Sequence, residues 1–273
     1  EKFNKTKFIL WTHGNRLQLS EIETIKNLFD RIIFVSNYAR KKNIDLFEPR
    51  ILKTISNFLV FDETLIKKYF ELDIFNLKDE DNIISYIGNV SKGLYNLNYI
   101  IPELRKYNKN FKIQIFSEPH FYLPHKSNTV SEDPTLQSIK NYNEVIYFKK
   151  TGKEEMCKML EKSNILISPN TFNESFCLSL IEGMFMELKC VTTNRAVIPE
   201  TCGKYGIYTS TLDPTDDNKQ TDMNLKEFTD NLAESIEKYR TNKKEMKDQK
   251  QFVFDAYHPL KIVKEWIKFF NEY

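Results

Sequence analysis

The 273-residue chain has no apolar run near the roughly 18 residues that a membrane-spanning helix requires, and no secretory leader pattern. It also has no excess of one charge, because 40 basic side chains stand against 38 acidic ones and the two signs are interspersed, for a net charge of +2. No long-range field therefore attracts nucleic acid or an anionic membrane, and a phosphate ligand must be held locally. These absences predict a cytoplasmic protein that binds no nucleic acid.

Metal-binding and redox patterns are also missing. The four cysteines have neither Cys-x-x-Cys spacing nor neighbouring histidines, so we expect small core residues rather than a zinc site or a disulfide scaffold. His120 and His125 have no evident third metal ligand, and residues 213–217 are typical of a solvated acidic turn. No Gly-x-Gly-x-x-Gly follows a predicted strand, which argues against a dinucleotide-dependent oxidoreductase. The cysteines in question are Cys157, Cys177, Cys190 and Cys202.

What the chain does have is a repeating α/β pattern. Apolar residues make up 41% of it, enough for a substantial core in one large or two modest domains. Short β-branched runs alternate with helical stretches, which predicts parallel sheets. Strands are expected at 7–14, where the strand ends in His13-Gly14, and at 31–36, 83–87, 111–116, 144–148, 164–167 and 189–192. Helices are expected at 20–30, 93–107, 153–162, 176–187 and 225–239. A last helix should begin at Pro259, with Ile262, Val263, Trp266 and Phe270 on its apolar side.

Two carboxylates lie around one predicted strand-to-helix loop. Glu174 falls in the loop, and Glu182 follows eight residues later on the expected helix. Eight residues at 100° each leave an offset of about 80°, so both acids can face one ligand. Backbone N–H groups at the helix start, near Phe176 and Cys177, lie between them, and this end of a helix attracts phosphate. The sequence therefore predicts a phosphate site with an acid on either side.

This arrangement resembles the Glu-x7-Glu motif of retaining glycosyltransferases of family 4, which have the two-domain GT-B fold. Two further segments are similar to that family. Residues 83–94 contain a strand, the turn glycine Gly88, Ser91 as a predicted helix N-cap, and then Lys92-Gly93; residues 197–200 end in Pro-Glu. A strand that ends in His13 and a second that ends in Ser36 fit the family's acceptor-side domain.

The resemblance implies a function and roles for particular residues. Glu174 would hold hydroxyls of the donor sugar, Glu182 the ribose, and Lys92 the diphosphate, while His13 would stand at the rim of the cleft. The segments of Gly88 and Asn89 and of Phe176 and Cys177 would also contact the nucleotide. The reaction implied is transfer from a nucleotide-diphosphate sugar to an unknown glycan, protein or lipid acceptor, with retention of configuration. No metal is required, because a lysine and backbone amides perform its role.

The same resemblance divides the chain into three parts. Residues 1–62 would be a remnant of the acceptor-side domain, 63–255 the nucleotide-sugar donor domain, and 256–273 a C-terminal crossover helix. The family's first half has no counterpart here, so the chain is either a piece of a longer protein or has a reduced acceptor side. A half sheet exposes an edge and an apolar face, which a missing segment or a partner subunit should cover.

Some positions depart from the family pattern. Asn89 stands where an arginine commonly helps to bind the diphosphate, and Asn194-Arg195-Ala196 stands where glycines are preferred. Arg195 either restores the lost positive charge or is a solvated loop residue. Two alternatives therefore stay open: a nucleotide-sugar binding module without catalysis, and a nucleotide-sugar epimerase of the same architecture.

Overall fold

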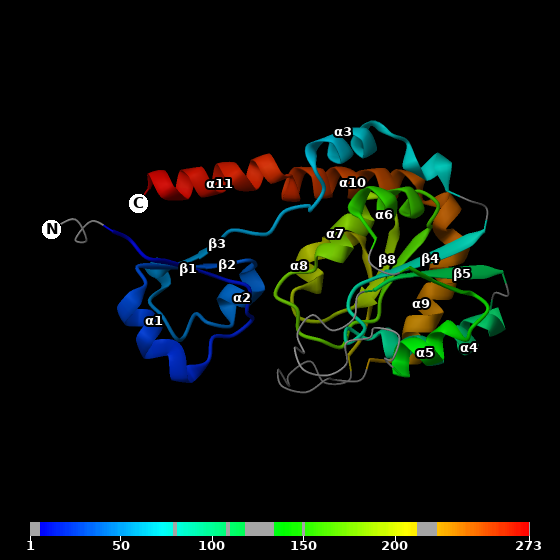
Figure 1. Ribbon diagram of the computed structural model, residues 1–273, viewed down its shortest axis with the longest axis horizontal. Coiled ribbons are helices and arrows are strands. Elements are labelled where there is room, and N and C mark those ends of the chain that lie inside the picture. Colours follow the sequence, from blue (N-terminus) through cyan, green and yellow to red (C-terminus); the bar gives the residue numbers. More distant parts are fainter. Residues whose placement is uncertain are drawn as a thin grey trace.

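The chain forms two parallel β-sheets that lie side by side (Figure 1). The structure, a computed structural model, describes residues 6–78, 81–107, 110–117, 134–148, 151–211 and 223–272. One sheet has three strands and is formed near the N-terminus, and the other has six. The predicted α/β class with parallel sheets is therefore confirmed. None of the helices in these described ranges combines the length and the apolar content that crossing a bilayer requires.

The smaller unit draws on both ends of the chain. It contains strands β1 (Ile9–Thr12), β2 (Arg31–Phe34) and β3 (Leu52–Thr54), helices α1 (Ile22–Leu28) and α2 (Asn37–Lys41), and the last helix, α11 (Pro259–Asn271). Successive residues of β2 face opposite sides of the sheet. Ile32 and Phe34 pack with α1 and α2, whereas Ile33 packs with Ile262 and Phe269 of α11. Helix α11 thus covers the face opposite to α1 (Figure 1).

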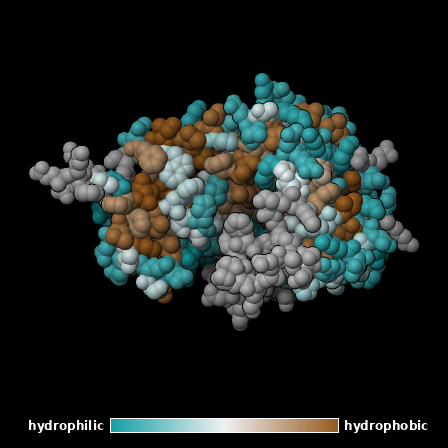
Figure 2. Space-filling model, in the orientation of Figure 1, coloured by the Kyte–Doolittle hydropathy of each residue, from teal (hydrophilic) through white to brown (hydrophobic). Residues whose placement is uncertain are grey.

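Helix α11 buries only part of the side predicted, because Trp266 packs against the cluster of Ile262 but two of the four residues do not. Ile262 is buried as expected, but Phe269 is buried with it, whereas Val263 and Phe270 are 48% and 54% exposed. The prediction for Val263 and Phe270 was therefore wrong. With Leu260 and Ile267 these two residues form an exposed apolar stripe on α11. Figure 2 shows apolar surface gathered over this part of the molecule.

The larger sheet contains a change of direction that creates a ligand crevice. Its strands run in the order β6-β5-β4-β7-β8-β9, all parallel. The chain proceeds outward from β4 to β6 and then returns to place β7 on the other side of β4. Parallel sheets bind ligands outside the carboxyl ends of two strands at such a switch point. The strands are β4 (Asn82–Ile87), β5 (Phe111–Phe116), β6 (Val145–Phe148), β7 (Ile165–Ser168), β8 (Lys189–Thr193) and β9 (Gly206–Thr209).

Helices cover both faces of the larger sheet. Residues of β7 alternate between the two, so that Leu166 enters one apolar cluster and Ile165 and Ile167 enter the other. The cluster of Leu166 is packed by α3 (Glu63–Glu71), α6 (Lys153–Leu160), α7 (Leu178–Phe185), α8 (Ile198–Cys202) and α10 (Lys243–Tyr257). The opposite cluster is packed by α4 (Leu97–Tyr107), α5 (Pro134–Lys140) and α9 (Leu225–Lys238).

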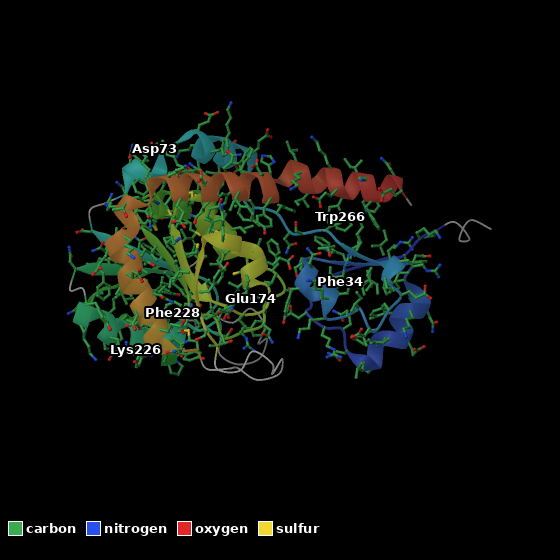
Figure 3. The ribbon with its side chains drawn as sticks, turned by 180° about the vertical axis from the view of Figure 1, so that it is seen from behind. Phe34, Asp73, Glu174, Lys226, Phe228 and Trp266 are labelled. Carbon is green, nitrogen blue, oxygen red and sulfur yellow. The ribbon has the colours of Figure 1, made fainter. Side chains whose placement is uncertain are left out.

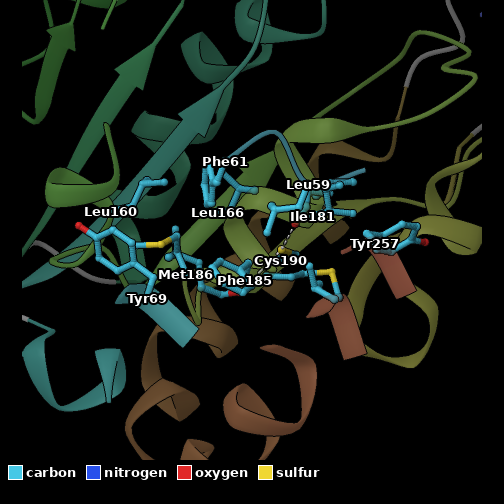
Figure 4. Packing of buried hydrophobic residues seen from close by; sticks show 14 of the residues in the cluster. Leu59, Phe61, Tyr69, Leu160, Leu166, Ile181, Phe185, Met186, Cys190 and Tyr257 are labelled. Atoms are coloured by element: carbon cyan, nitrogen blue, oxygen red, sulfur yellow. Dashed lines mark hydrogen bonds between the residues drawn. The ribbon is translucent and has the colours of Figure 1, made fainter. Parts of the chain in front are cut away.

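Figure 4 shows part of the first cluster, in which Leu166 and Cys190 of the sheet pack with Ile181 and Phe185 of α7. Burying each of the larger of these side chains contributes about 1.5–3 kcal/mol. All four cysteines are buried and free, as expected of core residues. This packing fixes α7, and with it Glu182, against strands β7 and β8.

Candidate functional site

The two loops that the sequence singled out meet at the switch point of the larger sheet. Residues 88–93 follow β4, residues 169–177 follow β7, and these strands are neighbours. Figure 3 labels Glu174 on the side of the larger unit that faces the three-stranded unit, where Phe34 lies. The site is therefore built at the edge predicted for ligand binding in such sheets.

A buried asparagine organises the loop after β7. The Asn170 Nδ2 donates to Oε1 of Glu174 at 2.6 Å, and its Oδ1 accepts from the N–H of Phe172 at 2.8 Å. The hydroxyl of Thr193 on β8 donates to the Asn170 carbonyl at 2.8 Å. Glu174 is only 6% exposed. Its carboxylate is thus held in one place by a side chain that is itself anchored to the sheet.

Helix α7 begins at Leu178, two residues later than predicted. The reason is local: Cys177 has extended backbone torsions and precedes the helix, and the Phe176 ring packs edge-on against Tyr257 at 5.6 Å. The first-turn N–H groups therefore belong to Leu178 and Ser179 rather than to Phe176 and Cys177. This corrects the predicted amide positions, although the helix start still lies between the two acids.

The loop after β4 is closed by its own polar groups. Asn89 Oδ1 accepts from both the N–H and the hydroxyl of Ser91 at 3.0 Å, and the Tyr86 hydroxyl donates to the Asn89 carbonyl at 2.6 Å. Ser91 is therefore not the helix N-cap that the sequence predicted. A 3₁₀ turn (Leu94–Asn96) and then α4 follow only after Gly93, whose φ of +90° reverses the chain direction.

Gly93 allows the two loops to touch. A Cβ atom at this position would lie 1.9 Å from the carbonyl oxygen of Pro169, so only glycine fits. The same carbonyl accepts from Asn96 Nδ2 at 3.1 Å. This close approach brings Lys92 Nζ to 3.2 Å from Glu174 Oε1. The structure thus brings together the lysine and the first glutamate that the motifs identified.

A second lysine pairs with the second glutamate. Lys153 Nζ lies 2.5 Å from Glu182 Oε1, and Glu182 is 1% exposed. Burial raises the pKa of the Glu182 carboxyl, and the charge and hydrogen bond of Lys153 oppose this rise. Sequence reasoning placed Lys153 only on a core helix and missed it. The available signal was a lysine at the first position of α6, because the start of a helix favours acidic residues.

These residues line one cavity of about 270 Å³. Gly88 and Phe176 contribute to its wall together with Leu178 and Ser179 from the start of α7. Two carboxylates and two ammonium groups thus surround the N-terminus of one helix. The charged residues that line it are Lys92, Lys153, Glu174 and Glu182.

An adjoining cavity of about 630 Å³ lies between the two units and shares Lys92, Glu174, Phe176 and Leu178 with the first. His13, directly after β1, lines it, and so does Asn89. Partial burial lowers the pKa of His13, so its imidazole is neutral at pH 7. Cys177 is buried and lines neither cavity. Apart from Cys177, every residue predicted for the site therefore lines one of two connected cavities.

Direct hydrogen bonds hold the small unit against the large one beside these cavities. The Glu200 carboxylate accepts from the N–H groups of Asn37 and Tyr38, both at 2.8 Å, at the start of α2. The Ser175 hydroxyl donates to the carbonyl of His13. Glu200, from the predicted Pro-Glu segment, therefore contacts the smaller unit.

The segment before Glu200 differs from both alternatives considered for Arg195. This side chain is buried rather than solvated, and it lines neither cavity. Ala196 has a φ of +50°, a conformation that glycine adopts without strain. The positive φ explains why a glycine is favoured at this kind of turn.

Within the described residues, no three His, Cys, Asp or Glu side chains gather closely enough to hold a metal ion. His120, His125 and residues 213–217 lie outside the described residues.

The sequence model of one family, described as Glycosyl transferases group 1, matches residues 81–222. A search of curated protein sequences found no match. Among solved structures, a glycosyltransferase from Rickettsia africae aligns with a TM-score of 0.71 at 17% identity, over 99% of this chain and 72% of that one.

The Anabaena protein HepE in complex with UDP aligns with a TM-score of 0.75 at 13% identity, over 100% of this chain and 74% of HepE. HepE in complex with UDP-glucose aligns with a TM-score of 0.71 at 11% identity, over 98% and 73%. At these identities the similarity establishes the fold, and the chain spans about three quarters of the length of these proteins.

Proposed function

Since the chain belongs to the group 1 glycosyl transferases, whose family model matches just over half of it, we propose that it transfers a sugar from a nucleotide-diphosphate sugar to an acceptor, with retention of anomeric configuration. The observation that carries this proposal is the cavity in which Glu174 and Glu182 flank the start of α7 and Lys92 contacts Glu174. An anionic ligand with hydroxyl groups on both sides of its phosphates matches this arrangement of charges.

In the proposed complex, the two acids bind the two ends of the donor. Ionised carboxylates only accept hydrogen bonds, and the hydroxyls of a sugar and of ribose donate them. Glu174 would hold the sugar, because Asn170 fixes its carboxylate beside the interunit cavity where an acceptor can enter. Glu182 would hold the ribose from deeper in the first cavity.

The diphosphate would lie between the acids, where negative charge develops as it leaves. Groups that stabilise this charge more in the transition state than in the ground state increase the rate. Lys92 supplies a positive charge, and the first N–H groups of α7, at Leu178 and Ser179, supply aligned dipoles. Such fixed donors can perform this role without a metal ion.

The acceptor would enter through the interunit cavity, next to His13. The group that accepts the sugar would be a hydroxyl of a glycan, a protein or a lipid. Residues 1–62 would form the acceptor side, residues 63–255 the donor domain, and residues 256–273 the crossover helix. The outer edge of β1 pairs with no other strand among the described residues, so we propose that a further segment or a partner subunit covers it.

The test begins with binding. Uridine, guanosine and adenosine diphosphates and their glucose derivatives are screened by thermal shift and calorimetry, with UDP-glucose first because HepE has been determined with it. A ligand at 100 times its dissociation constant should stabilise the protein by about 2.7 kcal/mol. Glu182→Ala should weaken nucleotide binding, whereas Glu174→Gln should leave nucleotide binding intact and abolish turnover of the sugar donor.

Lys226→Ala is the matched control, because Figure 3 shows Lys226 far from Glu174 and its salt bridge to Asp230 is on the surface. Binding without hydrolysis or transfer of any donor would favour the binding module instead. Exchange of solvent protons into the sugar would favour an epimerase. If the unaltered protein binds no nucleoside diphosphate, the proposal is wrong.

A further inference from the structure

Lys153 reaches the buried Glu182 from the rim of the first cavity. Its ammonium lies 2.5 Å from Glu182 Oε1, while its own side chain stays 42% exposed on the first turn of α6. The hydrogen bonds of the described residues engage one oxygen of Glu182 and leave Oε2 for a ligand. The pair therefore combines a partly exposed cation with a buried carboxylate, and both residues line the cavity.

The position of Lys153 is electrostatically unfavourable for its own helix. The start of a helix carries partial positive charge and stabilises acids rather than lysine. Glu154 and Glu155 directly after it follow the usual preference. A residue that opposes its local preference commonly has a functional role, and here the obvious one is the contact with Glu182.

The other titratable groups near Glu182 or in its cavity do not replace this cation. Cys157, also on α6, is electrostatically coupled to Glu182, and burial raises its pKa to about 12, so it remains a neutral thiol. Burial likewise raises the pKa of Tyr86, which lines the cavity from β4. Lys92 and Glu174 line the same cavity and bond to each other. Lys153 is thus the cation in contact with Glu182 among the described residues.

We propose that Lys153 is a positioning residue for the donor: it keeps Glu182 ionised and directs its second oxygen to the ribose hydroxyls. This inference rests on the proposed function and adds a residue that the motifs do not contain. An ionised carboxylate offers acceptors on both oxygens, so one can bond the ammonium and the other a ribose hydroxyl. A protonated Glu182 would present a donor in place of one acceptor and lose this complementarity.

The rival role for the same ammonium is direct contact with the diphosphate. Asn89 leaves the cavity one positive charge short of the family pattern, and Lys153 could contact the diphosphate directly. The two roles predict different dependence on the ribose hydroxyls. Contact through Glu182 requires those hydroxyls, whereas contact with phosphate does not.

The experiment compares each protein's affinity for a nucleoside diphosphate and for its 2′,3′-dideoxy analogue, measured by calorimetry. The base is the one among uridine, guanosine and adenosine diphosphates that binds the unaltered protein most tightly. Lys153→Met should weaken binding of the diphosphate at pH 7 by about ten- to a hundredfold, the range for a charge-assisted hydrogen bond. Affinity for the dideoxy analogue should change by less than about threefold.

A pH series gives a second, independent readout. Binding requires ionised Glu182, so affinity is full above its pKa and falls as the pH drops through it. Lys153 opposes the effect of burial on the pKa of Glu182. In Lys153→Met the acidic limb, which is the loss of affinity as the pH falls, should therefore move to higher pH. Lys153→Arg, which keeps the charge, should retain the limb of the unaltered protein. Lys158→Met on the same helix is the control, since Lys158 pairs with Glu154 on the surface.

A double variant tests whether Lys153 acts through Glu182, and does not rely on the stability of a single variant. With Glu182→Gln already present, Lys153→Met should cause no further loss of affinity. Equal losses for the diphosphate and its dideoxy analogue would overturn the proposal in favour of direct phosphate contact. An unchanged affinity or acidic limb in Lys153→Met would also overturn it. Failure of the unaltered protein to bind any diphosphate would overturn the proposed function and, with it, this inference.

Discussion

Replacing Gly93 with alanine tests the contact on which the site depends. The new Cβ would lie 1.9 Å from the Pro169 carbonyl oxygen, and the residue would have to keep a φ of +90°. Neither loop can yield freely, because the same carbonyl accepts the Asn96 hydrogen bond at 3.1 Å. The loops must therefore separate, which moves Lys92 away from Glu174.

The magnitude follows from three contributions. A left-handed conformation costs alanine about 1–2 kcal/mol relative to its preferred region. Loss of the Asn96 hydrogen bond costs about 1 kcal/mol. Alanine also restricts the unfolded chain, which offsets about 0.4–1 kcal/mol. With the steric clash added, we expect Gly93→Ala to lower the free energy of unfolding by about 2–4 kcal/mol.

Two glycines provide matched controls. Gly203 also has a positive φ, +54°, but its ψ of −133° lies outside the left-handed helical region, and the nearest atom to an added Cβ is 3.9 Å away in the Phe252 ring. Gly203→Ala therefore tests backbone strain without a steric clash, at a cost of about 1–3 kcal/mol. Gly152 has an ordinary φ of −62° and no atom within 4 Å of the added Cβ. Gly152 is the N-cap of α6, where alanine is less favourable than glycine. Alanine also restricts the unfolded chain, which offsets this loss. We therefore expect the free energy of unfolding to change by less than about 1 kcal/mol.

Urea unfolding of the three variants gives the stabilities, and calorimetry gives their affinity for the nucleoside diphosphate. Gly93→Ala should be the least stable and the one that loses affinity. If Gly93→Ala were no more destabilising than Gly152→Ala, or kept full affinity, the close approach of the two loops would be refuted.

Three further predictions concern other carboxylates. Glu182→Gln should reduce the dependence of stability on pH: burial raises the pKa of Glu182, so the stability it contributes is full below its unfolded pKa and is lost as the pH rises through the folded value. Urea unfolding gives the free energy of unfolding of the variant minus that of the unaltered protein, and this difference should be more favourable to the variant at pH 8 than at pH 5. An equal difference at the two pH values would contradict the prediction. Glu187→Ala removes the acceptor for Lys250 Nζ at 2.7 Å and for the Phe75 N–H at 2.6 Å, which should cost about 3–5 kcal/mol by urea unfolding because the lysine stays buried. A loss below 1 kcal/mol would exclude a buried pair. Glu200→Ala should lower the free energy of unfolding by about 1–2 kcal/mol, as loss of a helix cap does. It should also speed hydrogen exchange at the first two amides of α2, and unchanged exchange would contradict the contact.

The sequence predicted the parts of the site whose residues lie close together in the chain or follow strands that end at the same edge of the sheet. Glu174 and Glu182 belong to one strand-loop-helix segment, so helical geometry alone relates them. Lys92 follows a neighbouring strand, and parallel strands end at one edge of a sheet. The residues the sequence missed depend on packing between distant elements: Lys153 meets Glu182 only because α6 packs beside α7.

Errors in the elements have similar causes. Ser91 has the side chain of an N-cap, but the positive φ of Gly93 delays the helix, and one sequence does not reveal that torsion angle. On α11, apolar residues occupy two sides, so periodicity could not choose between them. The buried side is the one on which Ile262 and Phe269 pack against Ile33 and Ile55 of the smaller unit. Strand β3, with three residues, was too short to be recognised.

The packing of α11 across the first sheet has a consequence for biosynthesis. Ile33 and Ile55 leave the ribosome more than 200 residues before their partners Ile262 and Phe269. Domains that use neighbouring residues can fold during translation, in order from the N-terminus. Here β2 and the segment after β3 lack the helix that packs on Ile33 and Ile55 until α11 has been synthesised. We therefore expect a nascent chain arrested before Pro259 to be a target for chaperones, even where its six-stranded domain has already folded.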